Sequence, residues 1–183
     1  MKHLVPFILF IVFNYTSFSQ SEKNDYLAWS STRKLTVNDF GIKIKDTQPN
    51  ASYAQFIMGY QVNGFDMFAK NFNRKVQNNM IPSASWIGPT MDVAVTLQYQ
   101  QTLFDIAEVY ARQFRKQLKI NKRKFVKGTS FVKDLDASIM TAFAKRRLLY
   151  DLETTSGFDK IKQQQWEDQV QKEPDELKMY SRE

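Results

Sequence analysis

The fold is decided by residues 90–118, which read TMDVAVTLQYQQTLFDIAEVYARQFRKQL. Apolar residues recur here with the 3.6-residue period of an α-helix, at Val93, Leu97, Phe104, Ala107, Ala111, Phe114 and Leu118. Thr90 is suited to cap this helix, and Asp92 places a negative charge in the first turn, where the helix dipole favours it. We therefore expect one long helix from residue 91 to about residue 119.

Upstream of this helix the period changes to that of a β-strand. One face of the first strand would carry Ala54, Phe56, Met58, Tyr60 and Val62, and the alternation resumes at Phe65, Met67 and Ala69. Asn63-Gly64 between the two runs is a favoured two-residue hairpin turn. We expect a hairpin here, a third strand that includes residues 83–87 and ends at Gly88-Pro89, and an edge strand at residues 34–37.

Two further helices are expected downstream. The second carries Val132, Leu135, Ile139, Phe143 and Leu149 and is ended by Gly157. The third runs from about residue 158 to residue 171, before Pro174. Strands first and helices afterwards predict an α+β fold, in which a small antiparallel sheet packs against a long central helix and two further C-terminal helices.

Composition excludes several kinds of catalysis. The chain has 183 residues, 26 Lys and Arg against 19 Asp and Glu, no Cys and a single His, His3. Without cysteine there is no disulfide framework and no Cys-His catalysis. Without a histidine beyond residue 3, a Ser-His-Asp triad and the usual zinc sites are also excluded from the rest of the chain.

The N-terminus has the features of a secretory signal peptide. Lys2 supplies a positive charge, an apolar run covers residues 4–13, and Ser17-Phe18-Ser19 offers small residues for cleavage before Gln20. We expect a signal peptide at residues 1–19 and one domain at residues 20–183, exported to the periplasm or secreted. No later segment is apolar enough to span a membrane, so no span is expected in the mature chain.

Residues 97–112, which read LQYQQTLFDIAEVYAR, resemble the central helix of the domain of unknown function 922 family, bacterial exported proteins described as zinc-dependent protease-like. Members of that family typically carry His-Glu-Gln-x-His-Phe-Asp-Ile there. Flanking blocks extend the resemblance from residue 29 to residue 180: Trp29-Ser30, residues 33–36, residues 39–41, Ser85-Trp86, residues 150–154, Gly157, Gln165 and Trp166. The resemblance implies a metallopeptidase-like domain.

The zinc motif itself is degenerate in this chain. The positions that the family gives to two zinc ligands hold Tyr99 and Leu103, and the position of the general base holds Gln100. A further histidine that commonly follows the closing Glu-Thr pair corresponds to Ser156. Leucine has no lone pair, and glutamine is not a base at neutral pH, so we expect no catalytic residues, no metal and no cofactor.

Helical geometry leaves two interpretations of the former metal face. Tyr99, Leu103, Ile106 and Tyr110 fall within one arc beside the apolar stripe, which favours a buried core. Alternatively, Tyr99 and Tyr110 line a remaining cleft and contact a ligand. Asp105 and Glu108 are expected on the polar side of the helix, with Glu108 and Arg112 as a surface ion pair. An oxygen-ligand metal site or a carboxylate pair would need Glu153 or Asp151 nearby.

The leading hypothesis is a non-catalytic family member that serves as a binding or structural protein of the cell envelope, with an envelope protein or peptide as partner. The alternative is a hydrolase that uses a hard metal ion or carboxylates at Tyr99, Asp105, Glu108 or Glu153. A third possibility is an anionic polymer bound by Lys122, Arg123 and Lys124, within a basic series that includes Arg112, Arg115 and residues 145–147.

Overall fold

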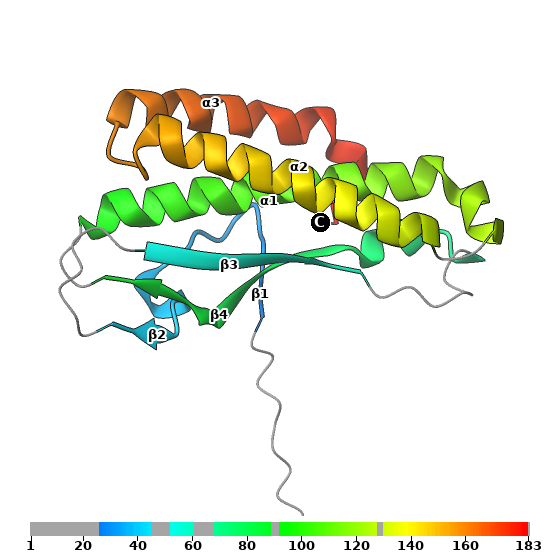
Figure 1. Ribbon diagram of the computed structural model, residues 1–183, viewed down its shortest axis with the longest axis horizontal. Helices are drawn as coiled ribbons and strands as arrows, with labels where there is room; N and C mark the ends of the chain where they lie inside the picture. Colours follow the sequence, from blue (N-terminus) through cyan, green and yellow to red (C-terminus); the bar gives the residue numbers. More distant parts are fainter. Residues whose placement is uncertain (1–25, 45–51, 61–67, 89–91, 128–129, 183) are drawn as a thin grey trace, which may run out of the picture.

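The computed structural model describes residues 26–44, 52–60, 68–88, 92–127 and 130–182. Within these ranges the chain forms a small sheet covered on one face by helices (Figure 1). Helix α1, Val93–Ile120, lies on the sheet, and helices α2, Ser130–Thr154, and α3, Lys160–Glu176, pack on the other side of α1. The expected α+β architecture is confirmed.

Strand β4, Gln77–Ile87, is the centre of the four-stranded sheet. It pairs antiparallel with β3, Ser52–Gly59, and with the short β1, Leu27–Ala28. The other short strand, β2, Ile42–Lys43, runs parallel to β4, which makes the sheet mixed. The predicted third strand is therefore present at residues 83–87, but it begins earlier and has three partners.

The first strand of the predicted hairpin is present as β3, but the strand predicted to pair with it is wrong. Ala54, Phe56 and Met58 are buried on one face of β3 as expected, but β3 pairs with β4, with Phe56 opposite Met80. Val62, Asn63, Gly64, Phe65 and Met67 lie outside the described residues. Phe68 and Ala69 are exposed, and the chain continues into the 3₁₀ helix η3, Phe72–Lys75.

The start of β4 could not be predicted from the sequence, because Gln77, Asn78 and Asn79 are polar and asparagine is depleted in strands. The Asn78 side chain instead donates a hydrogen bond to the backbone oxygen of Phe104 on α1, 3.2 Å away. Tertiary packing thus stabilises a strand that local propensity disfavours. Gly41, which precedes β2, lies against Pro82 of β4. A Cβ atom at residue 41 would be 2.8 Å from the Pro82 backbone oxygen.

The predicted edge strand at residues 34–37 is also wrong. Leu35 is buried, and its backbone N–H donates to Gln101 Oε1 of α1 at 2.8 Å, so it bonds a helix rather than a strand. A 3₁₀ turn follows, η1, Val37–Asp39, in which the Asp39 carboxylate accepts the Thr36 N–H at 2.7 Å. Strands β1 and β2 supply the edge instead.

The three helices occur where they were predicted, with different ends. Asp92 caps α1 by accepting hydrogen bonds from the backbone N–H groups of Ala94 and Val95, whereas Thr90 lies outside the described residues. In α2, Leu149 is 48% exposed, and it is Tyr150 that is buried. Helix α3 begins after its cap Asp159 and includes Pro174 in its last turns.

In the part of the chain that the structure describes, none of the helices combines the length and the apolar character needed to cross a membrane.

Candidate functional site

The positions of the degenerate zinc motif are buried. Tyr99 is 5% exposed, and Gln100 and Leu103 are 0% exposed. Gln100 donates a hydrogen bond to Ser52 Oγ of β3 at 2.9 Å, and Leu103 belongs to the main hydrophobic core. This burial agrees with the core interpretation of the helix face: within the part of the chain that the structure describes, these three side chains are packed.

Tyr99 is fixed by three contacts with the end of α2. Its ring stacks on Tyr150 with centroids 5.1 Å apart, and its hydroxyl donates to Asp151. Gly157, at φ 90°, lies so close that a Cβ there would meet Tyr99 Cβ at 2.7 Å. Burial and then the Asp151 carboxylate raise the pKa of the Tyr99 phenol, so the phenol stays protonated and acts as a donor.

The remaining predicted ligand contacts lie in different places. Ser156, which is the last position of the degenerate motif and not a predicted ligand contact, is exposed in the turn after α2, at φ 54°. Glu153 is also exposed and accepts the Trp166 indole N–H at 2.8 Å. Glu153 and the half-buried Tyr110 line a groove of about 640 Å³ between α2 and α3, which Tyr99, Asp105 and Glu108 do not reach. The structure therefore does not bring the predicted ligand contacts together in one site.

Glu108 forms the expected pair with Arg112, but the pair is buried, and the surface placement was wrong. Its Oε1 accepts from Arg112 Nε at 3.0 Å and from Arg115 Nη1 at 2.7 Å, and Arg115 is 1% exposed. The two guanidinium groups also donate to backbone oxygens of Val76, Pro174 and Tyr180. This triad joins α1 to Val76, the residue before β4, and to the C-terminal segment, so Arg112 and Arg115 are not part of a basic surface.

The other residues of the predicted basic series do not form one surface either. Lys122, Arg123 and Lys124 are exposed on the 3₁₀ helix η4, Lys122–Lys127, with the Lys122 and Lys124 amines over aromatic rings. Arg146 pairs with Glu173 of α3 at 2.5 Å, and Arg147 lies over the Tyr53 ring, 5.0 Å from its centroid. Arg146 and Arg147 therefore contribute to packing rather than to a continuous basic face.

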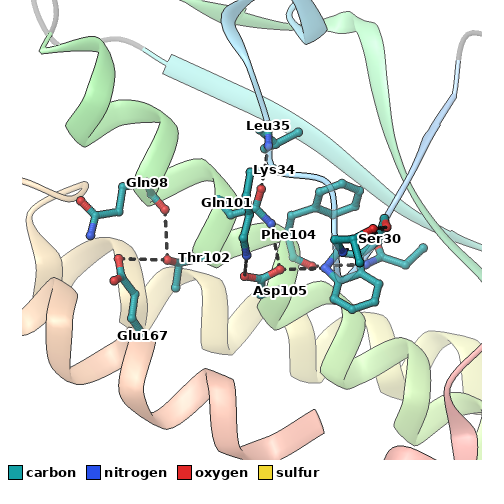
Figure 2. A network of polar contacts seen from close by, with 12 residues as sticks. Ser30, Lys34, Leu35, Gln98, Gln101, Thr102, Phe104, Asp105 and Glu167 are labelled. Atoms are coloured by element: carbon teal, nitrogen blue, oxygen red, sulfur yellow. Dashed lines mark hydrogen bonds and ion pairs between the residues drawn. The ribbon is translucent and has the colours of Figure 1, made fainter. Parts of the chain in front are cut away.

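Asp105 has the surroundings of a functional carboxylate. Its Oδ1 accepts the Trp29 indole N–H at 2.7 Å. The same oxygen accepts the Gln101 amide N–H at 2.9 Å, and the Lys34 amine lies 3.8 Å from Oδ2 (Figure 2). Burial raises the pKa of Asp105, against the lowering effects of Trp29, Lys34 and Gln101. A carboxyl with a raised pKa that lies at a cavity is a typical functional-site candidate.

The cavity at Asp105 is about 540 Å³ in volume, within the range of ligand sites. It lies between the N-terminal segment, α1 and α3, and its lining includes Trp29, Ser31, Lys34, Thr102, Asp105, Arg112, Glu167, Val170, Gln171, Pro174, Asp175, Lys178 and Ser181. We call this cavity the Trp29 cleft. It is the candidate functional site.

A second carboxylate reaches the Trp29 cleft from α3. Glu167 Oε1 accepts from Gln163 Nε2 at 2.7 Å and lies 3.5 Å from the Thr102 hydroxyl of α1 (Figure 2). Glu167 was not predicted, because the polar sequence around it is typical of a solvated helix face. Glu153 and Asp151, one of which a metal or carboxylate site at Asp105 and Glu108 would need, bond Trp166 and Tyr99 instead.

Among the described residues, no cluster of three or more His, Cys, Asp or Glu side chains has the geometry to hold a metal ion. A search of protein-family models, of curated proteins and of solved structures finds no match for this chain.

Proposed function

We propose that this protein is an exported, non-catalytic relative of the domain of unknown function 922 family, and that it acts as a binding or structural protein of the cell envelope. The observation that supports this role is the burial of Tyr99, Gln100 and Leu103, which occupy the positions of the zinc ligands and the general base. A metal-bound water needs space and ligands at that place, and packed side chains provide neither.

A second observation favours binding over a purely structural role. The Trp29 cleft is large enough for a ligand and is lined by polar side chains that are held in place by neighbours, among them Asp105 and Glu167. Such a preformed cavity with a few oriented polar groups is typical of a binding site.

Metal content and thermal stability test the non-catalytic role. The purified protein is expected to contain no stoichiometric zinc by elemental analysis, and EDTA is expected to leave its thermal midpoint unchanged. A matched variant, Tyr99→Phe, keeps the packing and removes the hydroxyl, so its zinc content should equal that of the parent. One tightly bound zinc per chain, lost in the variant, would overturn the proposal.

Export is tested separately by the intact mass of the protein from its native host. The mass should correspond to a chain that begins at Gln20 and is recovered outside the cytoplasm. A species that retains Met1 or Lys2 would contradict the assignment of residues 1–19 as a signal peptide.

A further inference from the structure

A second, smaller hollow adjoins the Trp29 cleft. This second cavity, about 250 Å³, shares Trp29 and Ser181 with the cleft and is also lined by Ala28, Asn78, Glu108, Arg115 and Arg182. Trp29 thus lies between the two hollows, with its indole N–H bonded to Asp105 and its ring 5.5 Å from the Arg112 guanidinium carbon. A ligand that enters the cleft meets an aromatic side chain held in one orientation.

The charges that line the cleft cancel. Lys34, Arg112 and Lys178 are opposed by Asp105, Glu167 and Asp175. Two of these cations already have partners, since Arg112 bonds Glu108 and Lys34 lies near Asp105. A polyanion or a polycation would therefore gain little from this site, and an uncharged polar ligand fits it better.

Glu167 in the cleft and Asn78 in the smaller hollow each present an acceptor oxygen to a ligand. Gln163 and Thr102 both contact Oε1 of Glu167, and no other described residue donates a hydrogen bond to Oε2. In the smaller hollow Asn78 is 3% exposed, and its Oδ1 has no hydrogen-bond partner within the described part of the chain. A buried acceptor without a partner is costly unless a bound group donates to it, and hydroxyl groups are suitable donors.

Backbone recognition of a peptide is not available along the helical walls of this cleft. Side chains of α1 and α3 form two of its walls, and the backbone groups of helix interiors are already bonded to one another. The Pro174 oxygen, near the end of α3, is taken by Arg112 and by the Leu177 N–H. Along these two walls a peptide would have to bind through side chains alone, whereas carboxylates, amides and an indole ring suit a molecule with hydroxyl groups and apolar C–H faces.

We propose that the Trp29 cleft binds a short, uncharged saccharide, which stacks on Trp29 and donates hydroxyl hydrogen bonds to Glu167 and Asn78. This inference rests on the proposed binding role and adds the class of ligand. The two fail differently: bound zinc would refute the non-catalytic role, whereas the ligand class is tested by titration alone.

The experiment is a titration followed by two-dimensional ¹H–¹⁵N NMR of the indole N–H groups of Trp29, Trp86 and Trp166 in the purified protein. The probes are triacetylchitotriose, cellotriose and maltotriose, with the capped peptide acetyl-trialanine amide and polyphosphate as comparisons. At least one saccharide should shift the Trp29 resonance with a dissociation constant below about 10 mM, while Trp86 and Trp166 stay in place.

The variant Glu167→Gln keeps the shape of the side chain and removes its charge, and it should weaken saccharide binding roughly tenfold. Asp168→Asn is the matched control, because Asp168 is exposed on the same helix, bonds Gln164 and does not line the cleft. It should bind like the parent. Thermal midpoints show that each variant is folded.

The proposal is overturned if no saccharide of the panel shifts Trp29, or if the peptide or polyphosphate shifts it at lower concentration. It is also overturned if Glu167→Gln binds like Asp168→Asn. The titration of the parent protein tests the proposal by itself, so the test still holds if a variant fails to fold.

Discussion

Replacing Leu103 with alanine should lower the free energy of unfolding by about 2 to 5 kcal/mol, because it leaves a cavity in the core. Leu103 is 0% exposed and lies in the main hydrophobic core, between the sheet and the outer helices. The change removes about three methylene-sized groups, worth roughly 2.4 kcal/mol at about 0.8 kcal/mol each, and the unfilled cavity adds to this transfer cost.

The assay is equilibrium urea denaturation of the parent and of two variants. Leu152→Ala is the matched control, because it makes the same chemical change on α2 at a side chain that is 70% exposed. The control should stay within about 0.5 kcal/mol of the parent. If Leu103→Ala also changes the free energy of unfolding by less than about 0.5 kcal/mol, the position is not packed, and the core interpretation of this helix face is wrong.

Three further predictions concern the polar groups of α1. Tyr99→His with Leu103→His should destabilise the protein about as much as Leu103→Ala in urea, and adding Gln100→Glu should yield weak zinc binding by calorimetry without peptidase activity while Ser156 remains. Glu108→Gln should cost about 3 to 5 kcal/mol in urea, because it leaves two buried guanidinium groups without a counter-charge, whereas the exposed Glu153→Gln should cost far less. Burial raises the pKa of Asp105 in the folded protein above its ordinary value of 3.8, so the contribution of Asp105 to stability falls as the pH rises from 3.8 to the pKa of the folded state. Over that interval the free energy of unfolding of Asp105→Asn should therefore rise relative to that of the parent. A difference that does not change with pH would contradict the raised pKa of Asp105.

The sequence was sufficient for the class of fold and for its central helix. The period of the apolar residues in α1 is a local property, and burial of one face of a helix follows from it in almost any tertiary setting. The burial of Ala54, Phe56 and Met58 along β3 was predictable for the same reason. The degenerate motif at Tyr99, Gln100 and Leu103 was likewise legible, because it depends only on residue type and spacing.

The partner of β3 was not predictable, because strand pairing is a contact between distant segments. The adjacent alternating run was the local choice, but the polar start of β4 takes that edge, with Asn78 bonded to α1. The same reason applies to Glu108. Its spacing to Arg112 was correct, but whether such a pair is exposed depends on what covers the helix, here Arg115 and the C-terminal segment.

The candidate site itself was decided by tertiary structure. Asp105 was a candidate from the sequence, but the second carboxylate that lines the cleft, Glu167, belongs to α3. Trp29, which bonds Asp105, lies in the N-terminal segment, 76 residues away in the chain. No local pattern relates three such residues, because their convergence depends on how α3 and the N-terminal segment pack against α1. Sequence periodicity determines which face of each element is buried, and only the packing of those faces decides which polar side chains meet at their margins.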